Sequence, residues 1–397
     1  MEKERLFSLL SERRQEHLLQ YFDGLTVEEK ADFARQIRLI DWKMLDFHSE
    51  CPNGEIAPIL PPPKGDFRAL GVEQIKNGKV AAVLLAGGQG TRLGSDAPKG
   101  TYDIGVTKPL YIFECLFKNL ISVNEECRAQ VPLLIMTSEK TDEATRAFLK
   151  EHAYFGYPAD MIRFFVQDTA PCVDEDGKIM LESKGKIATA PNGNGGWFSS
   201  LLRTEIPAWL NSLGVEWLNV FAVDNVLQKI ADPAFVGATV ASGKNCGAKV
   251  VKKANPFEKV GVLCLRGGKP DVVEYYEMDE NVAQSTDGKG ELLYPYGVIL
   301  NYLFRVEKLQ EVAQEKIPVH VVKKKIPYLS QDGTTVCPQT ENGYKFETLI
   351  VDMVRLMDDC LPFVVEREKE FAPIKNAEGV DSVQSARLLL QKNGVKL

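Results

Sequence analysis

VLLAGGQGTRLG, residues 83–94, is followed closely by Pro98-Lys99-Gly100. The apolar run Val80–Ala86 leads directly into the glycines, a pattern typical of a buried parallel strand that ends in a tight loop. Because glycine has no Cβ, backbone N–H groups in such a loop can approach an anion or a flat base closely. Arg92 and Lys99 add positive charge to the same loop. The stretch therefore predicts a binding loop for a polyanionic ligand at the carboxyl end of a strand.

Two commoner glycine loops do not fit this stretch. In the dinucleotide fingerprint counted from Gly88, the third glycine would fall on Leu93, but the glycine comes one residue later. The Walker loop requires Gly-Lys followed by Ser or Thr, whereas Gly90 precedes Thr91-Arg92. Glycines alone are equally typical of an ordinary turn. Glycines, an arginine and a Pro-Lys together in one loop favour a ligand site.

Strand-like runs and helices alternate after this loop. Apolar runs occur at Val131–Thr137, Arg163–Gln167 and Trp217–Val223, and a helix is expected from Thr141 to about His152. This alternation predicts an α/β fold with a mixed, mostly parallel sheet flanked by helices, and ligands at the carboxyl ends of its strands. Asp224 directly follows one run, so it is expected in the same layer as the glycine loop, where a carboxylate can hold Mg²⁺. An aspartate after a strand is also often only a helix N-cap.

The flanking regions have a different character. Residues 1–48 show helical spacing of apolar residues, with a capping box at Thr26 and Glu29, and the proline-rich stretch Cys51–Lys64 predicts a linker. Shorter β-like segments lie between residues 246 and 276, and a helix is expected at Phe346–Met357. We therefore predict an N-terminal helical region with linker at 1–75, a catalytic domain at 76–315 and a small C-terminal lobe at 316–397.

Composition excludes several classes of function. The chain has 397 residues and a net charge of -7, which argues against a general binder of nucleic acid or of membrane surfaces, since both need a positive field. No apolar run is long enough for a membrane span, and no export signal is recognisable. Eight cysteines without a C-x-x-C pair indicate reduced thiols, so a cytoplasmic protein is expected. The sequence is compatible with a monomer and with a homo-oligomer.

The glycine loop also carries a resemblance to a known family. Gly-Gly-x-Gly-Thr-Arg-Leu-Gly followed by Pro-Lys-Gly resembles the nucleotide-binding loop of the UDP-N-acetylhexosamine pyrophosphorylases. These uridylyltransferases make a UDP-sugar and pyrophosphate from UTP and a sugar 1-phosphate. The resemblance extends over nearly the whole chain and implies a Rossmann-like, GT-A-like nucleotidyltransferase fold. It also gives meaning to Pro191–Gly196, which as a bare pattern is more typical of a flexible turn.

The resemblance implies roles for individual residues. Family positions that hold the uracil correspond to Gly87, Gly88 and Gln167, and those at the ribose and sugar correspond to Gly193 and Asn194. Positions that contact sugar hydroxyls correspond to Gly261 and Glu274. The catalytic, phosphate-binding cations correspond to Arg92, Lys99 and Lys375, with Lys345 as a further phosphate contact. The metal position, for Mg²⁺ or Mn²⁺, corresponds to Asp224.

Two positions depart from the family pattern. Asn192 stands where the family usually has aspartate, a mild change, and Val298 stands where it usually has an asparagine that contacts the sugar. Valine has no group that can hydrogen-bond a hydroxyl or an acetamide, and Asn301 is the candidate to replace it or to act only as a cap.

The acceptor expected from the resemblance is N-acetylglucosamine 1-phosphate, and the alternative is glucose 1-phosphate or galactose 1-phosphate. A catalytically silent sugar-nucleotide sensor is a different class of hypothesis. A sensor is expected to lose the phosphate-handling charges, and these charges are all present.

Overall fold

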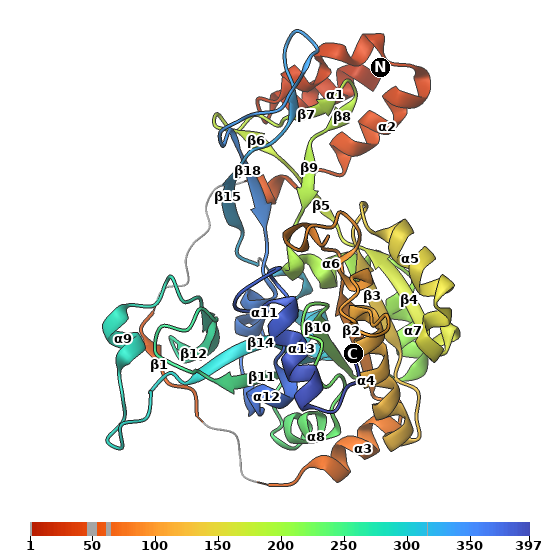
Figure 1. Ribbon diagram of the computed structural model, residues 1–397. Coiled ribbons are helices and arrows are strands. Elements are labelled where there is room, and N and C mark those ends of the chain that lie inside the picture. The colour runs from red at the N-terminus through yellow and green to blue at the C-terminus, as the bar shows by residue number, and fades with distance from the viewer. Residues whose placement is uncertain (1, 46–53, 61–64, 316) are drawn as a thin grey trace. The chain divides into compact units, whose positions relative to one another are not determined.

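The computed structural model describes residues 2–45, 54–60, 65–315 and 317–397, and the chain divides into two compact units (Figure 1). Unit 1 combines Met1–Cys51, Asp168–Gly196 and Ile317–Ile350, and unit 2 combines Pro52–Gln167, Trp197–Lys316 and Val351–Leu397. The three regions predicted from the sequence follow one another along the chain. Each compact unit instead brings together three separate stretches of it.

Unit 2 is built on a mixed sheet. Four neighbouring strands run parallel, in the order β10 (Trp217–Ala222), β2 (Val80–Leu85), β3 (Leu133–Thr137) and β4 (Ile162–Val166). The long strand β14 (Tyr296–Arg305) pairs antiparallel with the other side of β10. Because Ala222 of β10 is level with Leu85 of β2, the loops that follow these two strands leave the sheet at the same edge. The predicted α/β class with a mixed sheet is confirmed.

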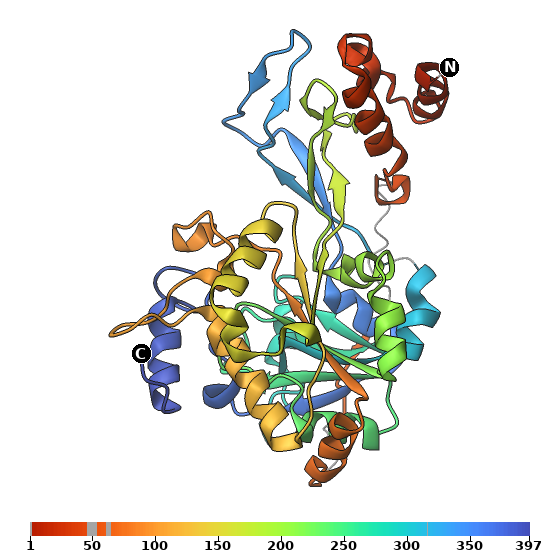
Figure 2. The ribbon, with the colours of Figure 1, turned by 90° about the vertical axis from the view of Figure 1, so that its right-hand side faces the viewer.

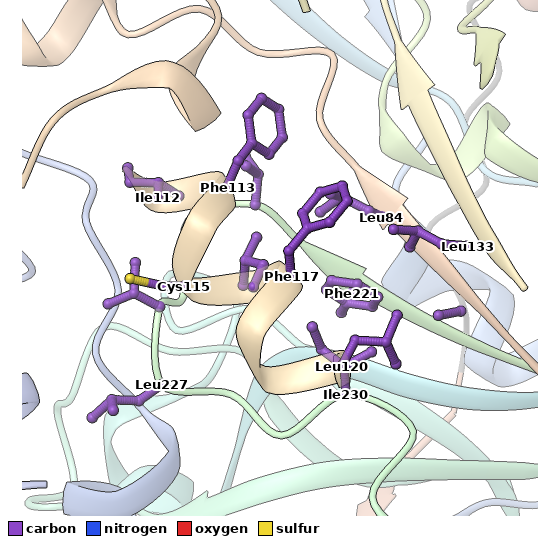
Figure 3. Close-up of a cluster of buried hydrophobic side chains, with 14 of the residues drawn as sticks. Leu84, Ile112, Phe113, Cys115, Phe117, Leu120, Leu133, Phe221, Leu227 and Ile230 are labelled. Atoms are coloured by element: carbon purple, nitrogen blue, oxygen red, sulfur yellow. The ribbon is translucent and has the colours of Figure 1, made fainter. Parts of the chain in front are cut away.

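Both faces of this sheet are covered by helices (Figure 2). Alternate residues of β2 point to opposite faces. Val80, Ala82 and Leu84 pack into the core with α4 (Ile112–Cys127). In Figure 3, Phe117 and Leu120 of α4 lie near Leu84 of β2, Leu133 of β3 and Phe221 of β10. Ala81 and Val83 face the other way and are also fully buried. Burial on both faces explains why β2 is a continuous apolar run.

The sheet continues beyond β14 as a mostly antiparallel extension, in which only β19 among the described strands pairs parallel, with β11. Its strands are β1 (Ile56–Ala57), β11 (Cys246–Lys252), β12 (Val262–Arg266), β13 (Lys269–Val273) and β19 (Leu361–Val364). The β-like segments predicted between residues 246 and 276 are thus strands. Of the predicted linker, the described residues 54–60 contribute the edge strand β1, and the rest lies outside the described residues.

The other helices of the chain outside the N-terminal segment are mostly short. They are α3 (Arg68–Lys76), α5 (Asp142–Glu151), α6 (Trp197–Leu202), α7 (Ile206–Leu213), α8 (Pro233–Ala241), α9 (Glu280–Gln284), α10 (Val306–Glu311), α11 (Ile350–Leu356), α12 (Arg367–Glu370) and α13 (Val383–Lys392). Turns of 3-10 helix are η3 (Thr91–Leu93), η4 (Lys99–Thr101), η5 (Ala153–Gly156), η6 (Ala159–Met161) and η8 (Val312–Gln314). None of the helices in the described part of the chain combines the length and the apolar character needed to cross a membrane.

Unit 1 joins N-terminal helices to small sheets. The helices are α1 (Glu2–Ser11), η1 (Glu16–Gly24), α2 (Val27–Arg38) and η2 (Trp42–Leu45), with η7 (Asn194–Gly196) later in the chain. The strands pair as β15 (His320–Lys324), β18 (Gly343–Glu347) and β6 (Val173–Asp174), as β5 (Thr169–Pro171) with β9 (Thr189–Pro191), as β7 (Leu181–Ser183) with β8 (Lys186–Ile187), and as β16 (Tyr328–Leu329) with β17 (Thr335–Val336). The capping box of Thr26 and Glu29 is present at the start of α2.

The helix predicted at Phe346–Met357 begins too early. Phe346 lies in β18, where it is level with Val321 of β15, and the helix begins only at Ile350. Phe346 is buried in a core that it shares with Phe33 of α2. Pairing with a strand far away in the sequence therefore decides the conformation of this residue, and local helical spacing does not reveal it.

Helices α3 and α8 touch backbone to backbone through glycines. A Cβ on Gly237 would lie 1.9 Å from the carbonyl oxygen of Phe67. We expect Gly237→Ala to lower the free energy of unfolding by about 1–3 kcal/mol, because the helices must separate to admit one methyl group. The urea midpoint of the whole protein measures this. In the control Gly288→Ala the added Cβ meets nothing within 4 Å, and equal midpoints for the two variants would contradict the prediction.

Candidate active site

The glycine loop after β2 folds back so that Lys99 returns to its beginning. Gln89 and Pro98 form an isolated β-bridge, and the Gly90 N–H donates to the carbonyl of Ala97 at 3.0 Å. The Lys99 N–H donates to the carbonyl of Gly88 at 3.1 Å. The loop therefore places a lysine directly beside the glycines.

Gln167 meets the same glycines from β4. Its N–H donates to the carbonyl of Thr137 at 2.8 Å, which continues the pairing of β3 with β4. A Cβ on Gly87 would lie 2.7 Å from Oε1 of Gln167, so only glycine admits this buried amide. A Cβ on Gly88 would meet nothing within 4 Å. The fold thus brings together the three residues predicted to hold the base, Gly87, Gly88 and Gln167. The space over Gly88 is open.

Asp224 lies next to Lys99. The Val223 N–H donates to the carbonyl of Leu85 at 3.2 Å, which extends the parallel pairing of β10 with β2 by one residue. Asp224 therefore leaves the sheet beside the glycine loop, and its Oδ2 lies 3.9 Å from Nζ of Lys99. The two side chains are 24% and 16% exposed, so the pair is open enough to contact a ligand.

Four predicted residues are coupled by charge. The pKa of Lys99 lies below its usual value, first because burial disfavours the ammonium form. Asp224 opposes this shift, whereas Lys375 and Arg92 lower the pKa of Lys99 further by repulsion. Arg92 itself is exposed in η3. An excess of positive charge held close together, with one carboxylate, is an arrangement suited to a polyphosphate.

Lys375 reaches this cluster on a backbone segment that runs antiparallel to the residues after β10. The Ile374 N–H donates to the carbonyl of Asp224 at 2.9 Å. Asn225 accepts at Oδ1 from the Ala372 N–H at 2.9 Å and donates from Nδ2 to the carbonyl of Glu370 at 2.8 Å. We call residues 370–375 the lysine strap. These bonds hold the lysine strap against Asp224.

A second group forms on the sheet extension. A Cβ on Gly261 would lie 3.4 Å from Oε1 of Glu274 and 3.4 Å from Cγ2 of Val298. The Val298 N–H donates to the carbonyl of Gly261 at 2.9 Å. The two predicted sugar contacts thus adjoin the position that departs from the family pattern.

Asn301 does not replace the asparagine absent at residue 298. Its side chain is fully buried, and its Oδ1 accepts a hydrogen bond from Nδ2 of Asn219 at 2.8 Å. Its Nδ2 faces the carbonyl of Lys229 and the side chain of Gln228, both at 3.3 Å. Asn301 therefore fastens β14 to β10 within the core, and the idea that it contacts the sugar is wrong.

The remaining predicted residues belong to unit 1. Gly193 has φ +87°, and a Cβ there would lie 2.2 Å from the carbonyl oxygen of Thr348, so glycine is required. Oδ1 of Asn194 accepts from the Ile350 N–H at 2.9 Å. Lys345 lies on β18, where its charge opposes the burial that raises the pKa of the Cys172 thiol to about 11.

Comparison with known proteins places the chain in a family. A family model described as UTP–glucose-1-phosphate uridylyltransferase matches residues 64–397. The chain belongs to this uridylyltransferase family. The human UDP-N-acetylhexosamine pyrophosphorylase-like protein 1 is 39% identical over 412 residues, with 95% of this chain and 81% of the relative covered. The Saccharomyces cerevisiae UDP-N-acetylglucosamine pyrophosphorylase is 36% identical over 345 residues, with 83% of this chain and 72% of the relative covered.

A solved structure agrees with this assignment. The UDP-N-acetylglucosamine pyrophosphorylase of Trypanosoma brucei, in complex with an inhibitor, is similar with a TM-score of 0.83 at 28% identity, and the match covers 99% of this chain and 85% of that chain. The resemblance inferred from the glycine loop is confirmed, and so is the nucleotidyltransferase-like fold. This uridylyltransferase is therefore an enzyme of the nucleotidyltransferase class.

The residues that position the predicted site residues could not be predicted from the sequence. Asn225 holds the lysine strap, and a polar residue directly after Asp224 was the only local signal for it. Asp381, whose Oδ2 lies 3.3 Å from Nζ of Lys375, has no local signal. Among the described residues, no group of three or more His, Cys, Asp or Glu side chains could hold a metal by itself.

Proposed function

We propose that this uridylyltransferase transfers the uridylyl group of UTP to a sugar 1-phosphate and releases pyrophosphate, with N-acetylglucosamine 1-phosphate as the leading acceptor. The observation that carries the proposal is the charge cluster beside the glycine loop. There Nζ of Lys99 lies 3.9 Å from Oδ2 of Asp224, and the charges of Lys375 and Arg92 lower the pKa of Lys99. The contact between Gly87 and Gln167 supports a base at the inner end of the loop. The names of the relatives support the acceptor.

The reaction needs positioning and charge neutralisation rather than a protein nucleophile. An oxygen of the sugar 1-phosphate attacks the α-phosphorus of UTP in line. The bond from this phosphorus to the bridging oxygen breaks, and pyrophosphate leaves with the electron pair. The attacking phosphate is already anionic at neutral pH, so no general base is required.

The chain's own cations supply the charge neutralisation. In this scheme Lys99, Arg92 and Lys375 neutralise charge at the α-phosphoryl group and on the leaving pyrophosphate. The glycine backbone and Gln167 hold the uracil, since an amide offers a donor and an acceptor side by side. Gly261 and Glu274 contact the sugar. The roles expected for Gly193, Asn194 and Lys345 stay predictions.

A divalent cation fits the proposed site. Mg²⁺ is commonly held by one or two carboxylates together with substrate phosphates, so the single carboxylate of Asp224 suffices. Mg²⁺ or Mn²⁺ held there would supply positive charge that offsets the charge of the substrate phosphates. Asp224 would hold the ion, and Lys99 would remain free to contact phosphate.

The acceptor is tested by measuring pyrophosphate release from UTP with N-acetylglucosamine, glucose and galactose 1-phosphates in turn. N-acetylglucosamine 1-phosphate is expected to give the highest kcat/KM. A higher value for glucose or galactose 1-phosphate would favour the alternative, which Val298 keeps open because it adjoins Gly261 and Glu274. Binding of UTP without turnover on any acceptor would favour a catalytically silent sensor.

Val298→Asn is expected to raise kcat/KM for N-acetylglucosamine 1-phosphate about threefold to tenfold, because one added hydrogen bond is worth about 1 kcal/mol. Steady-state kinetics at saturating UTP measure this gain. Val298→Ala is the matched control, since it removes the same apolar atoms without adding a donor or acceptor. The interpretation of this position fails if Asn and Ala at residue 298 change kcat/KM equally.

We further propose that the enzyme acts in the cytoplasm. Every cysteine in the described residues is a free thiol, and all of these except Cys337 are buried. Free thiols persist in a reducing compartment. UTP and a sugar 1-phosphate are the proposed partners.

A further inference from the structure

Lys249 is a charged residue in the middle of the sheet and has no role in the scheme above. It lies on β11 with a side chain that is 0% exposed. Its ammonium donates to Oδ2 of Asp232 at 3.0 Å, to Oε2 of Glu370 at 2.5 Å and to the carbonyl of Lys229 at 3.2 Å. A lysine has three N–H donors, and all three are used.

Burying these three charged side chains costs desolvation free energy, so the ion pairs add little net stability to the core. Asp232 and Glu370 are also buried, with side chains 5% and 7% exposed. Burial alone would raise the pKa of Asp232, but the charge of Lys249 and its hydrogen bond hold that pKa below its usual value. The desolvation of such ions commonly offsets their attraction, so apolar residues of the same size would stabilise the fold equally well. The geometry that the ions impose is therefore the property to explain.

The partners of Lys249 come from the two segments that carry proposed catalytic residues. Lys229 and Asp232 end the loop that begins at Asp224, and Glu370 begins the lysine strap that ends at Lys375. The strap is also hydrogen-bonded to the start of the Asp224 loop. Ile374 bonds to the Asp224 carbonyl, and Ala372 and Glu370 bond to the side chain of Asn225. Lys249 thus ties the far end of each segment to the same point of the sheet.

We propose that Lys249 is a positioning residue, which fixes the lysine strap relative to the Asp224 loop so that the Lys375 ammonium and the Asp224 carboxylate face the same phosphates. This inference rests on the roles proposed above for Asp224 and Lys375. A residue that only stabilised the core would lower stability without acting through Lys375.

A double-mutant cycle separates the two roles. Turnover is measured for the wild type, Lys249→Met, Lys375→Ala and the double variant, well below the melting temperature of each. Lys249→Met is expected to lower kcat about tenfold or more with little change in the KM for UTP, and the double variant is expected to match Lys375→Ala alone, because coupled residues are non-additive. Multiplicative losses, or a normal kcat for Lys249→Met, would overturn the proposal.

One further variant replaces Lys249→Met if it does not fold, and another serves as a control. Lys249→Met removes the buried cation from Asp232 and Glu370. These carboxylates then keep only the longer ion pairs with Arg68 and Lys229, both at 3.8 Å, so the variant is expected to be destabilised. If it does not fold, the triple variant K249M/D232N/E370Q, which buries no charge at these three positions, takes its place with the same expected loss. Tyr302→Phe is the control for a change in the same sheet, since the Tyr302 hydroxyl is buried and has no hydrogen-bond partner among the described residues; its kcat is expected to be normal.

Amide hydrogen exchange tests the inference without any turnover. In Lys249→Met, the exchange rates of the Ala372 and Ile374 N–H groups are expected to rise about tenfold more than those of Leu134 and Ile135 in β3, because the strap opens locally whereas a loss of global stability acts on all four groups. Unchanged protection of the strap would overturn the proposal. If the wild type turned over no acceptor, the proposed function would fail, and the exchange rates would still decide the role of Lys249.

Discussion

Lys99→Ala is expected to slow turnover by about 100- to 1000-fold, the loss typical when one preorganised charge is removed from a reacting centre. The loop that returns to Gly88 holds this lysine beside the glycines and 3.9 Å from Asp224, so the substitution removes a cation whose position is fixed by the backbone. Pyrophosphate release at saturating UTP and acceptor measures the effect. Near-normal turnover in the variant would remove Lys99 from the mechanism.

Lys99→Arg is the matched control because it keeps the charge, and it adds a pH signature. Burial lowers the pKa of Lys99, as do Lys375 and Arg92, so the ammonium loses its proton at a lower pH than an ordinary lysine does. In the wild type kcat/KM for UTP is therefore expected to fall as the pH rises through this lowered pKa. Arginine stays protonated, so the alkaline fall is expected to disappear in Lys99→Arg. The same fall in both enzymes would assign it to another group.

Asp224→Asn is expected to reduce turnover in Mg²⁺ by a comparable factor of about 100 or more, since a neutral amide is a weak ligand for a hard cation. The substitution keeps the shape of the side chain and the backbone bond to Ile374. Binding of Mn²⁺ in the presence of UTP, followed by electron paramagnetic resonance, is expected to weaken in parallel. This second measurement reports on the metal site independently of catalysis.

Asp160→Asn serves as the control for the change in net charge. Asp160 is exposed in η6 of the same unit, and its substitution is expected to alter turnover by no more than about twofold. If Asp224→Asn retained the metal affinity and metal dependence of the wild type, the ion would have to be held elsewhere.

The elements that depend on local pattern were predictable. A fully apolar run that ends in glycines can be buried on both faces only inside a sheet covered by helices, and Val80–Leu85 is such a strand. Parallel neighbours must end at one edge, which is why a carboxylate directly after Trp217–Ala222 could be expected beside the glycine loop. The loop motif was also specific enough to predict the family.

Other features depend on residues that are distant in the sequence. Phe346 has a helical context but pairs with Val321, and residues of the expected C-terminal lobe are divided between two units. Asn301 looked free to contact a sugar, yet Asn219 of the neighbouring strand binds it in the core. Local periodicity does not reveal such pairing, because the partner that supplies the hydrogen bond or the packing surface lies far away in the sequence.

Burial and ion pairing explain why some features of this protein can be predicted from the sequence and others only from the folded structure. The residue types of the glycine loop, and therefore the polyanionic ligand, follow from the chain itself, because backbone freedom and charge are properties of single residues. The convergence of Lys99 and Asp224, and the attachment of the lysine strap to Lys249, follow only from the folded sheet. Coulomb and hydrogen-bond energies depend on distances that the strand order creates.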